Sequence, residues 1–324
     1  MTKFITLWAV ILICTCTSAQ LSVQQLNQTT TITFNQTTDG INNGSFNGSG
    51  FTPSPTDGQL NSNGIIVTGC SDGDLNFGDT NSEGDFARGR SNGNKTSGGI
   101  YAFEISDNNV ALGVQPAGSD MTPGDIIIKI INNTGFNAKS IDISYDIYEL
   151  NNENRSCSVI VSTSVDNTTY IHHLSLDYTT VEAENPSPQW IVQNQSINWV
   201  TDLQINSEYY LKFTIDDNGG SGSRDEIAID NIGIRLNGTA THSPEQLSSL
   251  FRINPNPADS YISVSSIVKI DKLEIYNTTG AKVKQFNTVT NNGAISVADL
   301  ARGIYVVKVE FTDKTVSTRK LVIR

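Results

Sequence analysis

The chain has 324 residues, of which 17% are charged, and its formal net charge is −12 at pH 7. The charge is uneven: residues 20–250 hold 9 Lys/Arg against 27 Asp/Glu, a net of −18, whereas residues 251–324 hold 11 against 6, a net of +5. Because an acidic body repels phosphate groups, this balance argues against nucleic acid as a partner of residues 20–250. With 4 Cys and 3 His in the whole chain, we do not expect a zinc site.

The N-terminus has the pattern of a secretory signal peptide. Lys3 supplies a positive charge, residues 4–16 are mostly apolar, and residues 17–19 are small, as a signal peptidase requires. We predict cleavage between Ala19 and Gln20, so that residues 1–19 are removed. A membrane anchor is the alternative, but the apolar run is too short to span a bilayer and polar sequence follows directly.

Alternating sequence predicts β-strands through most of the main body. Residues 141–147 and 209–215 alternate apolar with polar side chains, and residues 125–131 form a short β-branched run typical of a core strand. Turn sequences rich in Asn, Asp and Gly separate the runs, and no long window shows a helical stripe. We therefore expect an all-β chain with a large β-sandwich over residues 20–236 and a polar linker over 237–250.

The C-terminal body, residues 251–324, carries the most specific sequence signals. Four blocks occur in order, each a turn or strand-like run with characteristic residues: Asn254, Pro255, Asn256 and Pro257 before the first run, Gly280 in a turn, Gly303 and Tyr305 opening an alternating run, and Lys320 in the last run. This succession resembles the type A C-terminal sorting domain of the type IX secretion system, which is found in one group of Gram-negative bacteria.

The resemblance implies a small Ig-like β-sandwich that acts as an address. Its partner would be the type IX secretion machinery, which carries the protein across the outer membrane. The sorting domain is often removed while the cargo is released or attached to surface lipopolysaccharide. We therefore expect a secreted or outer-cell-surface protein whose own activity lies in residues 20–250.

Residues 20–236 resemble uncharacterised secreted, jelly-roll-like β-sandwich modules and, in the closing run over 220–232, jelly-roll carbohydrate-binding modules. The leading hypothesis is a non-enzymatic module that binds an extracellular glycan or acts in adhesion. A secreted glycan hydrolase and a purely structural surface module are the alternatives. Fold resemblance alone assigns no ligand residue.

The motifs of common hydrolases are missing from the sequence. His172 and His173 are adjacent in a strand-like run, so they face opposite sides, and no Gly-x-Ser-x-Gly or His-Glu-x-x-His pattern accompanies them. A pair of carboxylates for glycoside hydrolysis stays open, because their separation depends on the fold. Among aromatic residues that suit a sugar platform, Trp190 and Trp199 are expected mostly in the core, whereas Tyr148 is expected to be exposed.

A loop with EF-hand-like spacing makes Ca²⁺ a candidate structural cofactor. Asp72, Asp74, Asn76 and Glu83 occupy its first, third, fifth and twelfth positions, and alternate oxygen ligands let one loop wrap a hard cation. The position that needs Gly holds Phe77, and no helix flanks the loop, so a true EF-hand is not expected. A solvated acidic loop is the alternative.

A second group of candidate metal ligands comprises Asp216, Asp217 and Asp230, near Asp225 and Glu226. The apolar alternation changes phase between residues 229 and 232, which predicts a β-bulge near Asp230. The bulge either directs Asp230 toward a metal ion or places it to accept backbone hydrogen bonds. Both interpretations stay open.

Cys70 and Cys157 remain after the predicted signal cleavage. In an oxidising compartment they can form one disulfide. Two separate buried thiols are the alternative, because the sequence does not show that the two residues are close.

Overall fold

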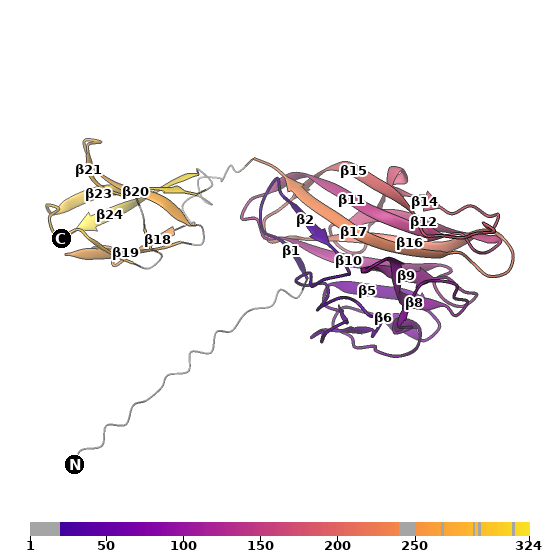
Figure 1. Ribbon diagram of the computed structural model, residues 1–324. Helices are drawn as coiled ribbons and strands as arrows, with labels where there is room; N and C mark the ends of the chain where they lie inside the picture. Colours follow the sequence, from indigo (N-terminus) through magenta and orange to yellow (C-terminus); the bar gives the residue numbers. More distant parts are fainter. Residues whose placement is uncertain (1–19, 240–250, 267–268, 288, 291–292, 313–314) are drawn as a thin grey trace, which may run out of the picture. The chain divides into compact units, whose positions relative to one another are not determined.

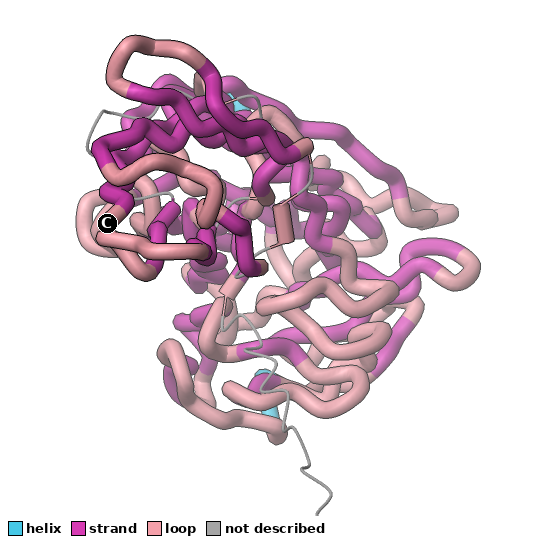
Figure 2. Tube along the Cα trace, turned by 90° about the vertical axis from the view of Figure 1, so that its left-hand side faces the viewer, coloured by secondary structure: helices cyan, strands magenta, loops and turns pink. Residues whose placement is uncertain are grey.

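The computed structural model describes residues 20–239, 251–266, 269–287, 289–290, 293–312 and 315–324. The predicted signal peptide, with Ala19, and most of the predicted linker lie outside these residues. The described chain is built of β-strands, with helix confined to two short 3-10 turns, η1 (Gly84–Phe86) and η2 (Leu174–Leu176), so the all-β prediction is confirmed (Figure 2). The chain divides into two compact units, Met1–Gly238 and Thr239–Arg324 (Figure 1).

The first unit, here called the main unit, contains two large sheets. Sheet A has the order β13 (Ile171–His172), β12 (Arg155–Ser164), β16 (Glu208–Gly220), β10 (Gly124–Asn132), β5 (Ile65–Cys70) and β6 (Gly73–Leu75). Two short strands join it: β1 (Leu21–Val23) pairs with β10, and β14 (Tyr178–Thr179) pairs with β12. Strands β10 and β16 contain the two predicted runs 125–131 and 209–215.

Sheet B has the order β15 (Ile191–Leu203), β11 (Ala138–Leu150), β17 (Glu226–Asn237), β9 (Asn109–Gln115), β8 (Gly99–Ser106) and β7 (Arg90–Ser91). The strand β2 (Thr29–Ile32) pairs with the second half of β17, and a separate pair is formed by β3 (Phe51–Thr52) and β4 (Leu60–Asn61). Strand β11 contains the predicted run 141–147.

One apolar core lies between sheets A and B. The inward side chains of β11 in sheet B and of β16 in sheet A are buried, and the rings of Tyr145 and Phe213 meet across the two sheets at 5.1 Å with an interplanar angle of 79°. Edge-to-face contacts of this kind between two large rings stabilise the packing of the two sheets. The polar residues that alternate with them in β11 therefore face away from the core.

The predicted β-bulge is present in β17. Asp146 is paired with Asp230 and Ser144 with Gly233, so the single residue between them in β11 lies opposite two residues of β17, Asn231 and Ile232. Asn231 takes up the extra length in the left-handed region, with φ of +51°. The bulge keeps Ile229 and Ile232 in the core although two residues, rather than one, lie between them.

The second unit also contains two sheets. The first has the order β18 (Phe251–Asn254), β19 (Tyr261–Ser266) and β22 (Ala294–Ser296). The second has the order β21 (Lys282–Phe286), β20 (Ile270–Asn277), β23 (Gly303–Phe311) and β24 (Val316–Ile323). Its own buried core includes Phe251, Val264 and Val307. The side chain of Asn256 pairs with the last strand: Nδ2 donates to Lys320 O at 2.7 Å, and Oδ1 accepts from Val322 N at 3.0 Å. Gly280, at φ of +82°, lies in the tight turn between β20 and β21.

The division between the two units, after Gly238, falls within the predicted linker over 237–250. Asn237, predicted as the first linker residue, is the last residue of β17. The next residue, Gly238, is held by Asn27, which donates from Nδ2 to Gly238 O at 3.0 Å. The ordered sheet therefore extends to the end of the first unit.

Candidate functional site

The outer face of sheet B, here called the polar face, presents polar side chains in cross-strand rows. One row contains Asn198 of β15, Asp142 of β11, Arg235 of β17 and Thr29 of β2. The next row contains Ser196, Ser144, Gly233 and Thr31 on the same four strands. A third row contains Asn194, Asp146 and Asp230.

Amide and carboxylate side chains on the polar face are bonded to one another. Asn194 Nδ2 donates to Asp146 Oδ1 at 2.5 Å, and Asn231 Nδ2, carried there by the bulge, donates to Asp146 Oδ2 at 2.8 Å. Asn198 Nδ2 donates to Asp142 Oδ1 at 2.5 Å. These bonds fix the planes of the side chains, and each group keeps donor or acceptor capacity free for a ligand.

The two acids of the third row differ in environment. Asp230 is buried beneath the segment after β2, where its Oδ1 accepts from Phe34 N at 3.4 Å. Burial raises the pKa of Asp230 to about 6, and the charge of Asp146 acts in the same direction. Asp230 therefore accepts a backbone hydrogen bond, as one of the two sequence interpretations expected.

Asp142, on the open part of the face, behaves differently. Burial acts to raise its pKa, but the amides of Asn198 and Asn237 and the guanidinium of Arg235 outweigh burial and hold the pKa of Asp142 below its ordinary value. The polar face therefore presents a charged acceptor at neutral pH.

An aromatic cluster closes one end of the polar face. Tyr101 and Phe103 of β8 are buried and stack at 5.1 Å with an interplanar angle of 3°. They lie over small residues: a Cβ on Gly113 would stand 2.2 Å from the Phe103 ring. Trp190, just before β15, tilts over Phe103 at 5.2 Å, and its indole Nε1 donates to Asn92 O at 3.0 Å. Tyr148 packs against this cluster and is half-buried.

Sequence reasoning predicted this site only in part. The position of Tyr148 on the outer face of its strand is confirmed, although it is half-buried rather than fully exposed. The roles of Asn194, Asn198, Asp142 and Asp146 were missed. The sequence shows two Asp four residues apart in one strand and two Asn four residues apart in another. This spacing indicates a shared site only when β11 and β15 are known to be neighbours.

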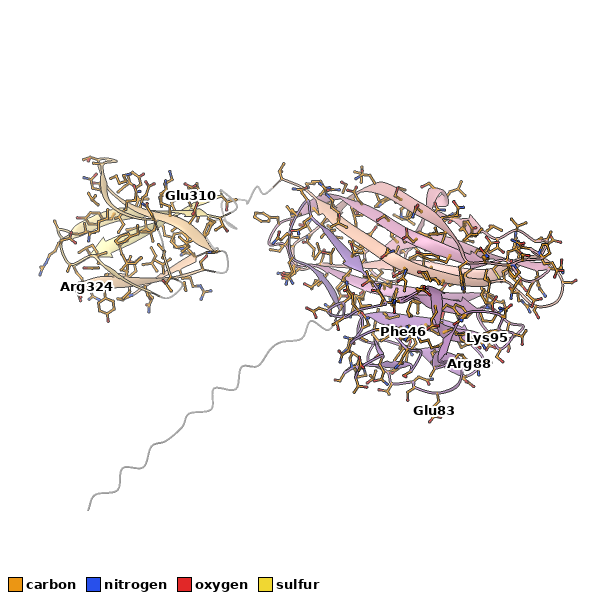
Figure 3. All side chains as sticks on the ribbon, viewed as in Figure 1. Phe46, Glu83, Arg88, Lys95, Glu310 and Arg324 are labelled. Carbon is orange, nitrogen blue, oxygen red and sulfur yellow. The ribbon has the colours of Figure 1, made fainter. Side chains whose placement is uncertain are left out.

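The first group of predicted metal ligands is engaged in local hydrogen bonds. Asp72 Oδ2 accepts from Asp85 N at 3.0 Å, and Asp74 Oδ1 accepts from Gly69 N at 3.1 Å. Asn76 donates to Asp79 through its backbone N, at 2.9 Å. Glu83 is exposed at the margin of the main unit (Figure 3). The contact between Asp72 and Asp85 ties the β5–β6 hairpin to η1.

The second group is also divided among several partners. Asp217 Oδ2 forms ion pairs with Arg155 and, at 2.7 Å, with Arg224, while Asp216 Oδ1 accepts from Asp217 N at 2.8 Å. Within the part of the chain that the structure describes, no three His, Cys, Asp or Glu side chains are grouped so as to hold a metal ion. Ca²⁺ binding stays a prediction, which the melting experiment described below tests.

Cys70 and Cys157 are free, buried thiols in this structure rather than disulfide partners. Cys70 Sγ lies 3.8 Å from Met121 Sδ, and Cys157 Sγ donates to Asp225 O at 3.2 Å. The reason is topological: β5 and β12 lie in one sheet with β10 and β16 between them, a separation of roughly 14 Å, whereas a disulfide requires Cα atoms within about 7 Å.

The two adjacent histidines point to different environments, as the alternation predicts. His173 is buried and its Nε2 lies 2.7 Å from Thr163 Oγ1, while burial lowers the pKa of His173. His172 is exposed and its Nε2 lies 2.7 Å from Asp177 Oδ2. Each imidazole is engaged with a neighbour in the sandwich, so the pair has a structural explanation.

Comparison with known families identifies the type of domain that forms the C-terminal unit. Residues 252–324 match the family described as the secretion system C-terminal sorting domain. This unit is a type IX sorting domain. The sorting domain directs export, so the protein is secreted or attached to the cell surface and interacts with the type IX secretion machinery. No helix of the described residues is long and apolar enough to cross a membrane.

Several solved structures are similar to the chain at low identity. The adhesin domain of Epf from Streptococcus pyogenes has 10% identity and a TM-score of 0.28, with 80% of this chain and 91% of that chain covered. A non-crystalline cellulose specific carbohydrate-binding module, CBM28, has 11% identity and a TM-score of 0.29, with 43% and 80% covered. The N-terminal cellulose-binding domain of Cellulomonas fimi β-1,4-glucanase C has 12% identity and a TM-score of 0.24, with 54% and 90% covered. No curated protein matches the chain.

Proposed function

We propose that the main unit is a non-enzymatic module that binds an extracellular glycan through the polar face of sheet B. The observation that carries the proposal is the pair of amide–carboxylate contacts, Asn194 with Asp146 and Asn198 with Asp142, in exposed rows beside an aromatic cluster. Sugar hydroxyls both donate and accept, so a planar amide beside a carboxylate offers them matched partners.

The aromatic end of the face supplies the second element that sugar recognition needs. Tyr148 and Trp190 combine an apolar ring with a polar tip, which suits the apolar faces and hydroxyl edges of a pyranose. Both are only partly buried, whereas Tyr101 and Phe103 beneath them are core residues. A few oriented polar groups beside an aromatic wall are typical of small-ligand sites.

Charge indicates which class of glycan fits. The polar face carries Asp142 and Asp146, and the surrounding residues 20–250 have a net charge of −18. A sulfated or uronate-rich chain would be repelled. The proposed ligand is therefore a neutral polysaccharide.

A glycan array with the chain from Gln20 onward tests the proposal. We expect selective binding to neutral glycans. The double variant Asp142→Ala/Asp146→Ala should weaken the hit by about 10- to 100-fold, because it removes two or more ligand hydrogen bonds worth about 1–3 kcal/mol together. Tyr148→Ala should also weaken it.

Asp125→Ala is the matched control. Asp125 is a partly buried acid of sheet A, 3.5 Å from Lys212 Nζ, so its loss changes the charge of the unit but not the polar face. If no neutral glycan on the array is bound, the result would support a purely structural module instead. If the bound glycan is cleaved, the result would support a secreted glycan hydrolase. Undiminished binding by the double variant would rule out the polar face as the site.

A further inference from the structure

Strand β15 is a long open edge of sheet B. It has 13 residues and pairs with β11 alone among the described strands (Figure 1). The other strands at the ends of sheets A and B are short: β7 has 2 residues, β6 has 3 and β13 has 2. Alternate amides and carbonyls of β15 therefore point away from the sheet, as a template for another strand.

This edge lacks the features that normally keep an edge strand unpaired. Residues 191–201 contain no charged residue, proline or glycine, and the one acid of the strand, Asp202, is bonded to Lys139 Nζ at 2.8 Å. Its register with β11 is regular from Ile191 to Val200. Two outward side chains are apolar and exposed, Val192 at 45% and Val200 at 78%.

The outward side chains of β15 read the same in both directions. They are Val192, Asn194, Ser196, Asn198 and Val200, which is a palindrome centred on Ser196. Two antiparallel copies of the strand, related by a twofold axis at Ser196, would therefore place Val192 opposite Val200 and Asn194 opposite Asn198 on each side of the axis. In such an isologous contact every pair occurs twice.

We propose that two copies of this chain associate edge to edge through β15, so that sheet B continues from one main unit into the next. The valine pairs would cover the exposed apolar side chains at both ends of the contact. In the middle, Asn194 uses its Nδ2 to reach Asp146 within its own chain, and its second hydrogen and its Oδ1 stay available to Asn198 of the other copy.

The distribution of charge favours β15 as the contact between the two copies. Two bodies of net charge −18 each repel one another over most of their surfaces, whereas residues 191–201 are uncharged. Pairing there brings no carboxylate of one strand directly opposite a carboxylate of the other. The polar faces of the two copies would also become one continuous surface, with two equivalent sites on a single sheet.

The molar mass of the chain from Gln20 onward, measured by light scattering after size exclusion, tests this association. We expect twice the monomer mass for the native sequence. Ser196→Lys places two ammonium groups at the twofold axis, and Ser196→Glu places two carboxylates there, so each variant alone should dissociate at least about tenfold more readily. An equal mixture of the two variants should recover the dimer, because the opposed charges are then complementary.

Thr31→Lys is the matched control, since Thr31 is exposed at the far end of the cross-strand row that contains Ser196. It should leave the dimer mass unchanged. In the dimer, the two Ser196 Cα atoms would be about 4.5–5.5 Å apart, within disulfide range. Ser196→Cys should therefore cross-link under mild oxidation, whereas Thr31→Cys should not. A native chain of monomer mass, or an Ser196→Lys variant of unchanged dimer mass, would overturn the proposal.

Discussion

At the scale of single residues, three of the buried acids of the main unit have a raised pKa. Glu226 and Asp225 are fully buried at the start of β17, and Asp230 is buried at the bulge. Burial raises the pKa of Glu226 to about 7 and the pKa of Asp225 and Asp230 to about 6. Glu226 Oε1 accepts from Lys95 N at 2.5 Å, but within the described residues Oε2 has no hydrogen-bond partner. Burial therefore favours the neutral form of Glu226 over the carboxylate more than water does.

These acids make the stability of the main unit depend on pH. Between the ordinary pKa of Glu226, 4.5, and its folded value of about 7, the folded unit holds a proton that the unfolded chain releases. The free energy of unfolding therefore falls as the pH rises through this range. We expect a higher melting temperature at pH 5 than at pH 8.

Glu226→Gln isolates the contribution of one acid. The amide keeps the shape of the side chain and cannot ionise, so the variant should gain about 1–3 kcal/mol relative to the native chain at pH 8. At pH 5 the two should melt together. Calorimetry at both pH values measures this difference. Equal pH profiles for the native chain and the variant would show that Glu226 is not the titrating group.

At the scale of elements, the β5–β6 hairpin shows how hydrogen bonds between carboxylates and backbone amides hold an acidic loop. Asp72 and Asp85 bond to each other's backbone amides, at 3.0 Å in both directions. Such reciprocal bonds lock the hairpin to η1 and give the two carboxylates structural roles. The spacing that predicts a Ca²⁺ loop also suits this pair of turns, because both require oxygen acceptors near tight backbone bends.

Ca²⁺ remains a testable prediction for these elements. Millimolar Ca²⁺ should raise the melting temperature by the equivalent of about 1–3 kcal/mol relative to chelator, and NaCl of equal ionic strength should do much less. Asp72→Ala/Asp74→Ala should abolish the difference if the loop binds, and Asp230→Ala if the bulge binds.

The control is Asp107→Ala, which removes an exposed acid from the turn between β8 and β9. It should keep the Ca²⁺-dependent difference. A melting temperature that is the same with chelator and with excess Ca²⁺ would show that both groups are ordinary hydrogen-bonded acids.

At the scale of the whole molecule, the chain joins an acidic body to a basic one. Residues 20–250 carry a net charge of −18 and residues 251–324 a net of +5. This change of charge lies close to the division into compact units, after Gly238, and to the start of the match to the sorting domain at residue 252. The sorting domain that directs export therefore has a core of its own, separate from the core of the main unit.

Export provides the test at this scale. Deletion of residues 251–324 should leave the protein in the periplasm, because the address for the outer-membrane step is lost. Grafting the same residues onto a reporter that carries a signal peptide should bring the reporter to the cell surface or the medium, whereas the reporter with a signal peptide alone should stay in the periplasm. Normal secretion of the truncated chain, measured by immunoblotting of cell fractions, would contradict this assignment.

The sequence by itself determined the strands and the address. Alternation of apolar and polar residues identified β11 and β16, because the two faces of each strand differ in polarity. The change of phase in this alternation located the bulge in β17. Both patterns are local properties of the sequence. The sorting domain was recognisable because its blocks recur in a set order along the chain.

Only the tertiary structure decided which strands are neighbours. Cys70 and Cys157 are kept apart by β10 and β16, and the polar face exists because β15, β11, β17 and β2 adjoin in that order. Pairing between strands depends on contacts distant in sequence, where many arrangements satisfy the same period-two pattern. The carboxylates of β11 were therefore visible in the sequence as polar residues, and became a candidate site only when the amides of β15 were placed beside them.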